Sequence, residues 1–169
     1  MSGGEKPGKR FEAKFRESLP DGVFALRIPD ARTFHGTYAA VSESEADFIV
    51  ATGTHTSLVE CKAVNRPRLE FHNVKGHQER SLMEFDSLGP NTHGVLAVEF
   101  YDKRGYRMPK RMFLMPIAEW MRFRGETERA SMPVSEFEAS GLEVPYIGSR
   151  YAIEAWMLEG GERGIHGEG

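Results

Sequence analysis

Hydrophobic and polar positions along this chain follow two periods, one typical of helices and the other of strands. Apolar residues spaced three or four apart predict helices, and short runs rich in Val, Ile and Phe predict strands. The predicted helices are residues 8–18, 73–88, 116–123 and 134–140, and the predicted strands are residues 23–28, 47–51, 56–62, 94–101 and 111–115. Residues 151–158 fit either a strand or a helix. No repeat or linker divides the chain, which indicates one domain over residues 1–159.

Three segments show neither period. Residues 1–7 are expected to be flexible, and residues 160–169, which are rich in glycine, are expected to form a disordered tail. Residues 29–45 are rich in Thr, Ser, Ala and Gly and predict a projecting arm or irregular hairpin. Their aromatic side chains, Phe34, His35 and Tyr38, offer contact groups for a ligand or for a second subunit.

The strands on either side of Gly53 and Thr54 predict a hairpin whose tight two-residue turn has glycine first. Pairing about this turn places Asp47 opposite Glu60, and directly opposed Cβ atoms lie about 4.5–5.5 Å apart. Two carboxylates this close repel each other unless a proton or a cation lies between them. Because side chains alternate along a strand, Glu60 and Lys62 leave the same face. The hairpin predicts a divalent-metal site beside an ammonium group; the alternative is an ordinary exposed salt bridge.

Two predicted helices each place a polar residue on or beside their apolar stripe. Glu12 neighbours the stripe that contains Phe15, and its alternative role is an ion pair with Arg16, four residues on. Gln78 falls on the stripe of the helix at 73–88, where its amide must find hydrogen-bond partners or destabilise the fold. Those partners are either backbone groups or the carboxylates of the hairpin.

The limits of this second helix follow from its flanking residues. Asn73 is a good N-cap residue, and Gly89 followed by Pro90 is a strong stop signal. The apolar stripe expected to be buried consists of Val74, Leu82, Phe85 and Leu88.

Composition narrows the class of protein. With 169 residues, 40% hydrophobic and 28% charged, the chain is typical of a soluble globular domain. No apolar run approaches the ~20 residues that span a bilayer, and the N-terminus lacks an apolar signal region. We therefore expect no membrane partner and a cytoplasmic location, in the host cytoplasm if the protein is viral. The single cysteine, Cys61, fits a reducing compartment.

Charge is distributed unevenly along the chain. Residues 1–111 carry 17 Lys and Arg against 15 Asp and Glu, while residues 112–169 carry 5 against 10. The basic residues thus surround the predicted metal site, and some of the acidic ones there would be neutralised by the metal. This is a local footprint of the kind that nucleic acids bind.

The order of these residues resembles the PD-(D/E)xK nuclease superfamily and, within it, the RecU-type Holliday junction resolvases. The matching residues are Gly8, Phe11 and Glu12, the ADF of residues 46–48, the ECK of residues 60–62, Asn73 with His77 and Gln78, and Ser131-Met132-Pro133 followed by Gly141. The resemblance covers most of the chain. It implies an α/β fold with a restriction-endonuclease-like core, in which helices flank a mixed β-sheet and an arm or irregular hairpin projects.

The resemblance also implies the chemistry of the site. The catalytic residues would be Glu12, Asp47, Glu60, Lys62 and Gln78. Mg²⁺, with Mn²⁺ as a substitute, would be bound by Asp47, Glu60 and the Cys61 backbone carbonyl, with Glu12 as a candidate ligand of a second ion. DNA would be bound by Lys9, Arg10, Lys14, Arg66, Arg68, Lys75 and His77. The implied function is resolution of four-way DNA junctions by a homodimer, with paired hydrolysis that leaves 5′-phosphate nicks.

Departures from the family pattern leave other functions open. Residues 69–72, Leu-Glu-Phe-His, differ from the Phe-Pro-Leu that precedes the family's Asn, and residues 29–45 match poorly. Another PD-(D/E)xK endonuclease, of repair or restriction type, would share the site and differ only in the DNA shape it prefers. A non-catalytic DNA-binding module would need basic groups but no Glu-x-Lys motif, and a structural or regulatory protein would need neither.

Overall fold

The computed structural model describes residues 4–35, 38–102 and 110–160. Its helices are α1 (Pro7–Glu17), η1 (Phe71–Asn73), α2 (Gly76–Asp86), α3 (Ile117–Glu126), α4 (Val134–Ser140) and η2 (Ala155–Leu158), where η marks a 3₁₀ helix. Its strands are β1 (Phe24–Arg27), β2 (Ala31–His35), β3 (Tyr38–Ser42), β4 (Phe48–Ala51), β5 (Thr56–Val64), β6 (Arg68–Glu70), β7 (Thr92–Phe100), β8 (Arg111–Pro116), β9 (Ser131–Pro133), β10 (Leu142–Val144), β11 (Tyr146–Ile147) and β12 (Arg150–Tyr151). Residues 161–169 of the predicted tail and 1–3 of the predicted flexible start lie outside the described residues. None of the described helices is long and apolar enough to cross a membrane.

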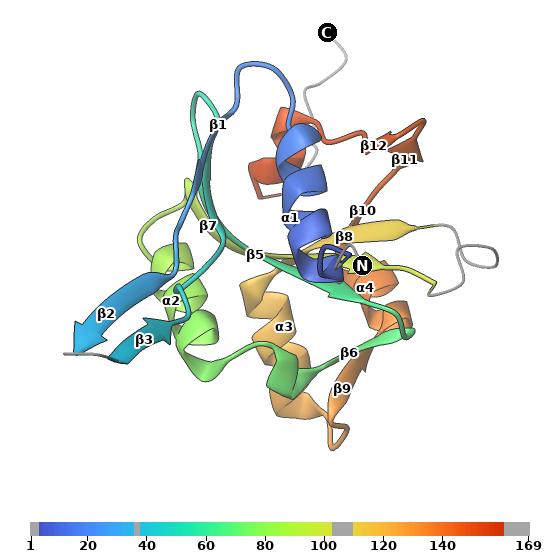
Figure 1. Ribbon diagram of the computed structural model, residues 1–169. Helices are drawn as coiled ribbons and strands as arrows, with labels where there is room; N and C mark the ends of the chain where they lie inside the picture. The colour runs from blue at the N-terminus through green and yellow to red at the C-terminus, as the bar shows by residue number, and fades with distance from the viewer. Residues whose placement is uncertain (1–3, 36–37, 103–109, 161–169) are drawn as a thin grey trace, which may run out of the picture.

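A six-stranded sheet in the order β1-β4-β5-β7-β8-β10 forms the centre of the fold (Figure 1). Its long central strands β5 and β7 run parallel, and every other neighbouring pair in the sheet is antiparallel. Parallel neighbours need a crossover connection, which here contains α2. The mixed character of the sheet therefore follows from a helix inserted between two apolar strands.

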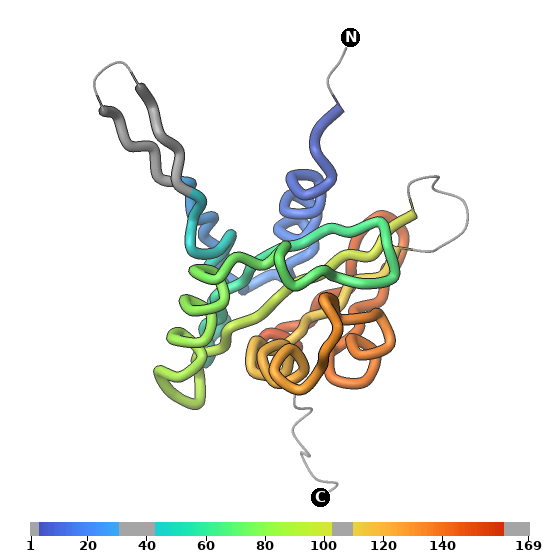
Figure 2. Tube along the Cα trace, turned by 90° about the horizontal axis from the view of Figure 1, so that it is seen from below, coloured from blue at the N-terminus to red at the C-terminus, as the bar shows by residue number. Residues whose placement is uncertain are grey.

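Helices cover both faces of this sheet and create two hydrophobic cores. On one face, α1 contributes Phe11 and Phe15 to a core that also includes Tyr151 from β12. On the other face, the core contains Leu82 from α2 and Trp120 from α3. Figure 2 shows α1 on one side of the sheet and α3 and α4 on the other. The structure confirms the expected fold class, an α/β protein whose mixed sheet is flanked by helices.

The segment predicted as an arm or irregular hairpin forms the antiparallel pair β2–β3. Its register runs from Ala31↔Ser42 to His35↔Tyr38. The pair makes a two-stranded sheet of its own and projects beside the end of β1 (Figure 1). Residues 36–37, at its tip, lie outside the described residues.

The predicted helix at 73–88 is shorter than expected. Asn73 ends the 3₁₀ turn η1 and is not the N-cap; Lys75 precedes α2 in extended conformation, and its backbone N–H donates to the side-chain oxygen of Gln78 (3.0 Å). This hydrogen bond satisfies a helix-terminal donor, so it fixes the start of α2 after Lys75. At the other end α2 stops at Asp86, and Leu88 is 72% exposed rather than buried.

The central hairpin matches its predicted strands, with two corrections. Its loop has two residues, closed by a hydrogen bond from Thr52 N–H to His55 O (2.9 Å), but Gly53 does not have a positive φ. The predicted glycine-first turn would require one, so that turn type is wrong. The β4–β5 ladder ends at Phe48↔Val59, so Asp47 lies just outside it.

Other boundaries changed because short elements depend on distant partners. Pro116 ends β8 and caps α3, rather than being its first residue. The segment 151–158 divides into the end of β12 and the 3₁₀ turn η2. Strands β6, β9, β10 and β11 were not predicted, because two or three residues are too few to show a period.

Candidate active site

The candidate site lies where β5 runs on past the end of its neighbour β4. The β4–β5 ladder ends at Phe48↔Val59, whereas β5 stays paired with β7 as far as Val64. Among the described strands, the stretch of β5 after Val59 thus has a ladder partner on one side only. Four of the predicted site residues meet at this open edge: Asp47, Glu60, Lys62 and Gln78.

Asp47 takes the place of the missing strand partner. Its backbone N–H donates to Val59 O (3.0 Å), and its Oδ2 accepts a hydrogen bond from Cys61 N–H (2.8 Å). A strand residue points its N–H and its C=O toward the same neighbouring strand, so the Cys61 carbonyl faces this edge as well. Burial raises the pKa of Asp47, while the hydrogen bond from Cys61 opposes that rise. The edge therefore brings together two oxygen groups, a carboxylate and a backbone carbonyl.

Glu60 is the most buried carboxylate of the site, with 3% of the residue exposed. Its Oε1 accepts hydrogen bonds from Lys62 Nζ (2.7 Å) and Gln78 Nε2 (3.0 Å). Its Oε2 is buried and has no hydrogen-bond partner among the described residues. Burial, and then the charge of Asp47, raise the pKa of Glu60 to about 7, although Lys62 pulls it down. A cation bound at Oε2 would give this oxygen a partner and would lower the pKa of Glu60.

The Gln78 amide has both kinds of partner that the sequence left open, a backbone group and a carboxylate of the hairpin. Its side-chain oxygen accepts from the Lys75 backbone N–H (3.0 Å) and lies 3.4 Å from Lys62 Nζ, while its Nε2 donates to Glu60. The amide therefore caps the start of α2 and at the same time orients a carboxylate of β5. Cys61, between Glu60 and Lys62 in the chain, turns its side chain into the core below α1, as strand alternation requires.

Glu12 reaches the site from α1, on the opposite face of the sheet. It forms ion pairs with Lys9 (3.1 Å) and Arg27 (3.2 Å), and not with Arg16, the partner in the alternative interpretation of Glu12. Its charge raises the pKa of Asp47, which indicates that the two carboxylates interact. Sequence reasoning missed Arg27 as a partner. Alternation along β1 puts Arg27 on the same face as Ala25, which packs into the core beneath α1. That alternation was the sequence signal that could have placed Arg27 near Glu12.

The basic residues predicted to bind DNA have different environments. Arg10, Arg66 and Lys75 are exposed. Lys14 instead donates to the Ser149 carbonyl (2.9 Å), and Arg68 pairs with Glu70 (2.8 Å). For the first three, the side chain is accessible to a ligand in the folded protein.

Lys9 and His77 differ from these residues in their surroundings. Lys9 is committed to Glu12, as described above. His77 is partly buried at the start of α2, and its Nε2 has no hydrogen-bond partner within the described part of the chain. A buried ring nitrogen without a partner is unusual, which makes His77 a candidate contact for a bound group.

The donor set fits a hard, partly hydrated cation. Among the described residues, no three His, Cys, Asp or Glu side chains lie close enough together to enclose a metal ion. Mg²⁺ does not need such an enclosure, because it is held by one or two carboxylates, keeps several waters and takes substrate phosphates as ligands. Asp47, Glu60 with its unpartnered Oε2, and the Cys61 carbonyl satisfy that requirement.

The raised pKa of Glu60 predicts a pH dependence of stability in EDTA. A pKa raised from 4.5 to about 7 means that the folded protein binds this proton more tightly than the unfolded chain does. The stabilisation is complete below pH 4.5 and is lost as the pH rises through 7, by about 3 kcal/mol. We expect the wild type to lose about 3 kcal/mol of unfolding free energy relative to Glu60→Gln between pH 4.5 and pH 8, because glutamine does not titrate. The free energies are measured by urea denaturation. A gap that does not change with pH would contradict this.

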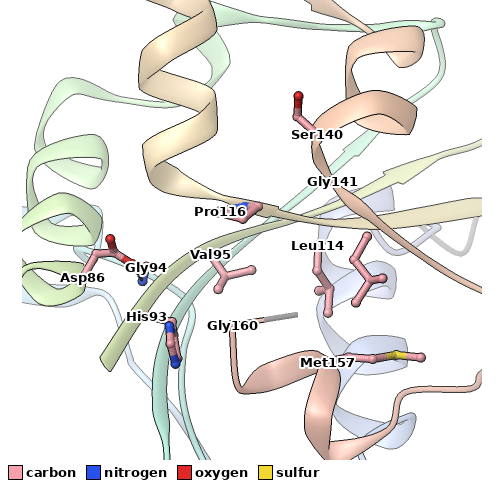
Figure 3. Close-up of a pocket in the computed structure, with 11 residues that line it drawn as sticks. Asp86, His93, Gly94, Val95, Leu114, Pro116, Ser140, Gly141, Met157 and Gly160 are labelled. Atoms are coloured by element: carbon pink, nitrogen blue, oxygen red, sulfur yellow. Dashed lines mark hydrogen bonds between the residues drawn. The ribbon is translucent and has the colours of Figure 1, made fainter. Parts of the chain in front are cut away.

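A separate cavity of about 240 Å³ lies near the start of β7, away from these residues (Figure 3). Val95, Leu114 and Met157 line it together with His93, whose ring stacks on His55 at 5.1 Å. Asp86 borders the cavity and accepts a hydrogen bond from Gly94 N–H (2.9 Å). None of the predicted site residues lines this cavity, so it does not belong to the candidate active site.

Comparison with known proteins gives a distant likeness to solved structures. No family model matches the chain, and no curated protein matches it in sequence. Among solved structures, the chain is similar to Hjc, a Holliday junction resolvase from the archaeal hyperthermophile Archaeoglobus fulgidus. The two share 16% identity with a TM-score of 0.46, over 80% of this chain and 91% of that chain. The neighbour is an archaeal Hjc rather than a RecU-type protein. Identity and TM-score are both low, so substrate and chemistry have to be inferred from the residues of this chain.

Proposed function

We propose that this protein is a metal-dependent DNA endonuclease that resolves four-way junctions. The observation that carries the proposal is the cluster at the open edge of β5. The half-buried carboxylate of Asp47 and the buried one of Glu60 both have raised pKa values, and an ammonium group and an amide fix Glu60. A structural salt bridge would leave neither an orphaned Oε2 nor a second carboxylate beside it.

The ligands would be Asp47, Glu60 and the Cys61 carbonyl, which supports Mg²⁺ as the ion and Mn²⁺ as its substitute. When bound, the ion supplies the charge that lowers the pKa of a nucleophilic water and stabilises the leaving oxygen. Glu12 approaches from the opposite face, where it would contribute to a second metal site or hold the attacking water. Hydrolysis in this manner leaves 5′-phosphates.

Lys62 and Gln78 have distinct roles in this proposal. Lys62 Nζ lies 2.7 Å from Glu60 and is 20% exposed, so its charge can act on a phosphate that enters the site. It would neutralise the charge that develops on phosphorus. Gln78 holds Glu60 in place through its Nε2. The exposed Arg10, Arg66 and Lys75 would contact the DNA backbone, where such contacts give position and affinity rather than sequence specificity.

The direct test incubates the purified protein with a synthetic four-way junction, a flap and a linear duplex, in Mg²⁺ and in EDTA. We expect the junction to be converted into nicked duplexes with Mg²⁺ only. Equal cleavage of all three substrates would favour a general PD-(D/E)xK endonuclease. Binding that depends on salt, without cleavage in Mg²⁺ or Mn²⁺, would indicate a DNA-binding module.

Assembly is the second element of the proposal. Symmetrical incision of two strands requires two active sites, and one 169-residue domain supplies one, so we infer a two-fold homodimer. The β2–β3 hairpin is paired only with itself among the described strands and projects from the main sheet, which supports a role in contacting the junction.

Deletion of residues 34–38 is therefore expected to weaken junction affinity by about tenfold or more, with little effect on duplex affinity or on the melting temperature. The melting temperature is preserved because the hairpin lies outside the six-stranded sheet. Affinities can be measured by fluorescence anisotropy on both DNAs, and mass by light scattering with and without junction. A lower melting temperature with equal loss on both DNAs, or a monomeric mass at micromolar concentration, would contradict the proposal.

A further inference from the structure

A buried carboxylate outside the metal site lies next to Gln78 in the chain. Glu79 is 6% exposed, in the first turn of α2. Its Oε1 accepts a hydrogen bond from the indole Nε1 of Trp120 (2.8 Å), and the Arg124 guanidinium contacts both of its carboxylate oxygens. A buried carboxylate with this many donors is strongly fixed in place.

These contacts join three elements. Trp120 and Arg124 belong to α3, and Arg124 lies 5.6 Å from the centre of the Phe71 ring in η1. Phe71 in turn packs edge-on against Trp120, with ring centroids 5.2 Å apart. Glu79 therefore ties the beginning of α2 both to α3 and to the 3₁₀ turn that leads into α2.

The first turn of α2 needs such an anchor. Helix starts leave backbone N–H groups without partners, and they are stabilised by Ser, Thr, Asp or Asn at the N-cap. Here the N-cap is Lys75, whose ammonium group cannot accept a hydrogen bond, and in the described structure only the Gln78 amide returns to this end of the helix. Consecutive helix residues point about 100° apart, so Gln78 can face β5 while Glu79 faces α3.

We propose that Glu79 is a positioning residue of the active site. Bound to Trp120 and Arg124, it fixes the first turn of α2, and thereby holds the Gln78 amide on Glu60. The catalytic consequence rests on the proposed nuclease function, whereas the effect on the Gln78 amide does not. The side-chain hydrogen bonds of Glu79 go to Trp120 and Arg124 and not to the predicted metal ligands, so we infer that its effect passes through Gln78.

The test is a double-mutant cycle that combines Glu79→Gln with Gln78→Ala. Glutamine keeps an acceptor for Trp120 and loses the charge that holds Arg124. We expect Glu79→Gln to lower kcat on the junction by about tenfold, with KM changed less than twofold, as expected for the loss of one oriented hydrogen bond. In the Gln78→Ala background the same change should lower kcat by less than about twofold, because the residue through which it acts is gone. Arg124→Lys, at a residue whose side chain is 40% exposed, is a milder variant should Glu79→Gln fail to fold.

Glu143→Gln is the matched control, since it also breaks an arginine–carboxylate pair, with Arg111 in β8, but far along the chain from α2. A second readout needs no activity: the rate at which the Gln78 side-chain amide protons exchange with water, followed by NMR and assigned by comparison with Gln78→Ala. We expect exchange about tenfold faster in Glu79→Gln and unchanged in Glu143→Gln. If Glu79→Gln speeds amide exchange but the wild-type protein cleaves no DNA, the positioning role of Glu79 is supported and the proposed nuclease function is refuted. Unchanged exchange, or equal kcat losses in both backgrounds, would overturn the positioning role itself.

Discussion

Glu60→Gln and Asp47→Asn are each expected to reduce junction cleavage by on the order of 10³-fold or more, with junction affinity in Ca²⁺ or EDTA largely unchanged. Removing a single charge-stabilising donor from an active site typically lowers the rate by about 10²–10³-fold. Each of these variants removes a negative charge from the predicted metal ligands and also weakens binding of the ion. Cleavage is measured on a synthetic junction across a Mg²⁺ titration, so that weaker metal binding and slower chemistry are separated.

Both variants should fold, because the amides keep the hydrogen bonds of the carboxylates that they replace. An amide oxygen at position 47 can still accept from Cys61 N–H, and one at position 60 can still accept from Gln78 and Lys62. Glu143→Gln, distant from β5 in the sheet, serves as the control and should cleave like the wild type. If thermal melts show that both site variants unfold, the carboxylates have a structural role and the metal site is refuted.

Lys62→Ala is expected to slow cleavage by on the order of 10²-fold, and Lys62→Arg should not restore the rate. The ammonium group lies between Glu60 Oε1 at 2.7 Å and Gln78 Oε1 at 3.4 Å, on a side chain that is only 20% exposed. A planar guanidinium is larger and presents its donors in a fixed fork, so it cannot replace a compact charge there. Lys6→Ala, which removes an exposed lysine, is the control for a general loss of positive charge.

A pH series separates two ways in which Lys62 could act. Lys62 also lowers the pKa of Glu60, so Lys62→Ala would leave more of Glu60 protonated near neutral pH. If the lysine served only to keep Glu60 ionised, the variant would recover the wild-type rate near pH 9. We expect the deficit to persist at that pH, as it should if the charge acts on the phosphate. Full activity of Lys62→Arg would instead show that diffuse positive charge is sufficient.

The sequence by itself determined the elements that carry long, regular patterns. The apolar runs of β5 and β7 and the Phe11 and Phe15 stripe of α1 could be recognised locally, because each depends on residues close in the chain. The same alternation correctly put Glu60 and Lys62 on one face of a strand and Cys61 on the other. It also placed Asp47 near Glu60, through a hairpin whose register was right as far as Phe48↔Val59.

Only the tertiary structure decided how these residues become a site. The edge of β5 is open because β4 begins at Phe48, directly after Asp47, and its ladder with β5 ends there. The alternating sequence pattern continues through Asp47, so it does not show where the pairing ends. The partners of Glu12 and Glu79, namely Arg27 and Arg124, lie 15 and 45 residues away. Alternation along β1 could indicate the face on which Arg27 lies, but not that Glu12 is its partner. The strands β6 and β9 pair with each other across more than 60 residues and are too short to have a pattern of their own. Periodicity reports which face a residue takes, whereas burial, pKa and hydrogen-bond partners arise from segments that meet only in the folded chain.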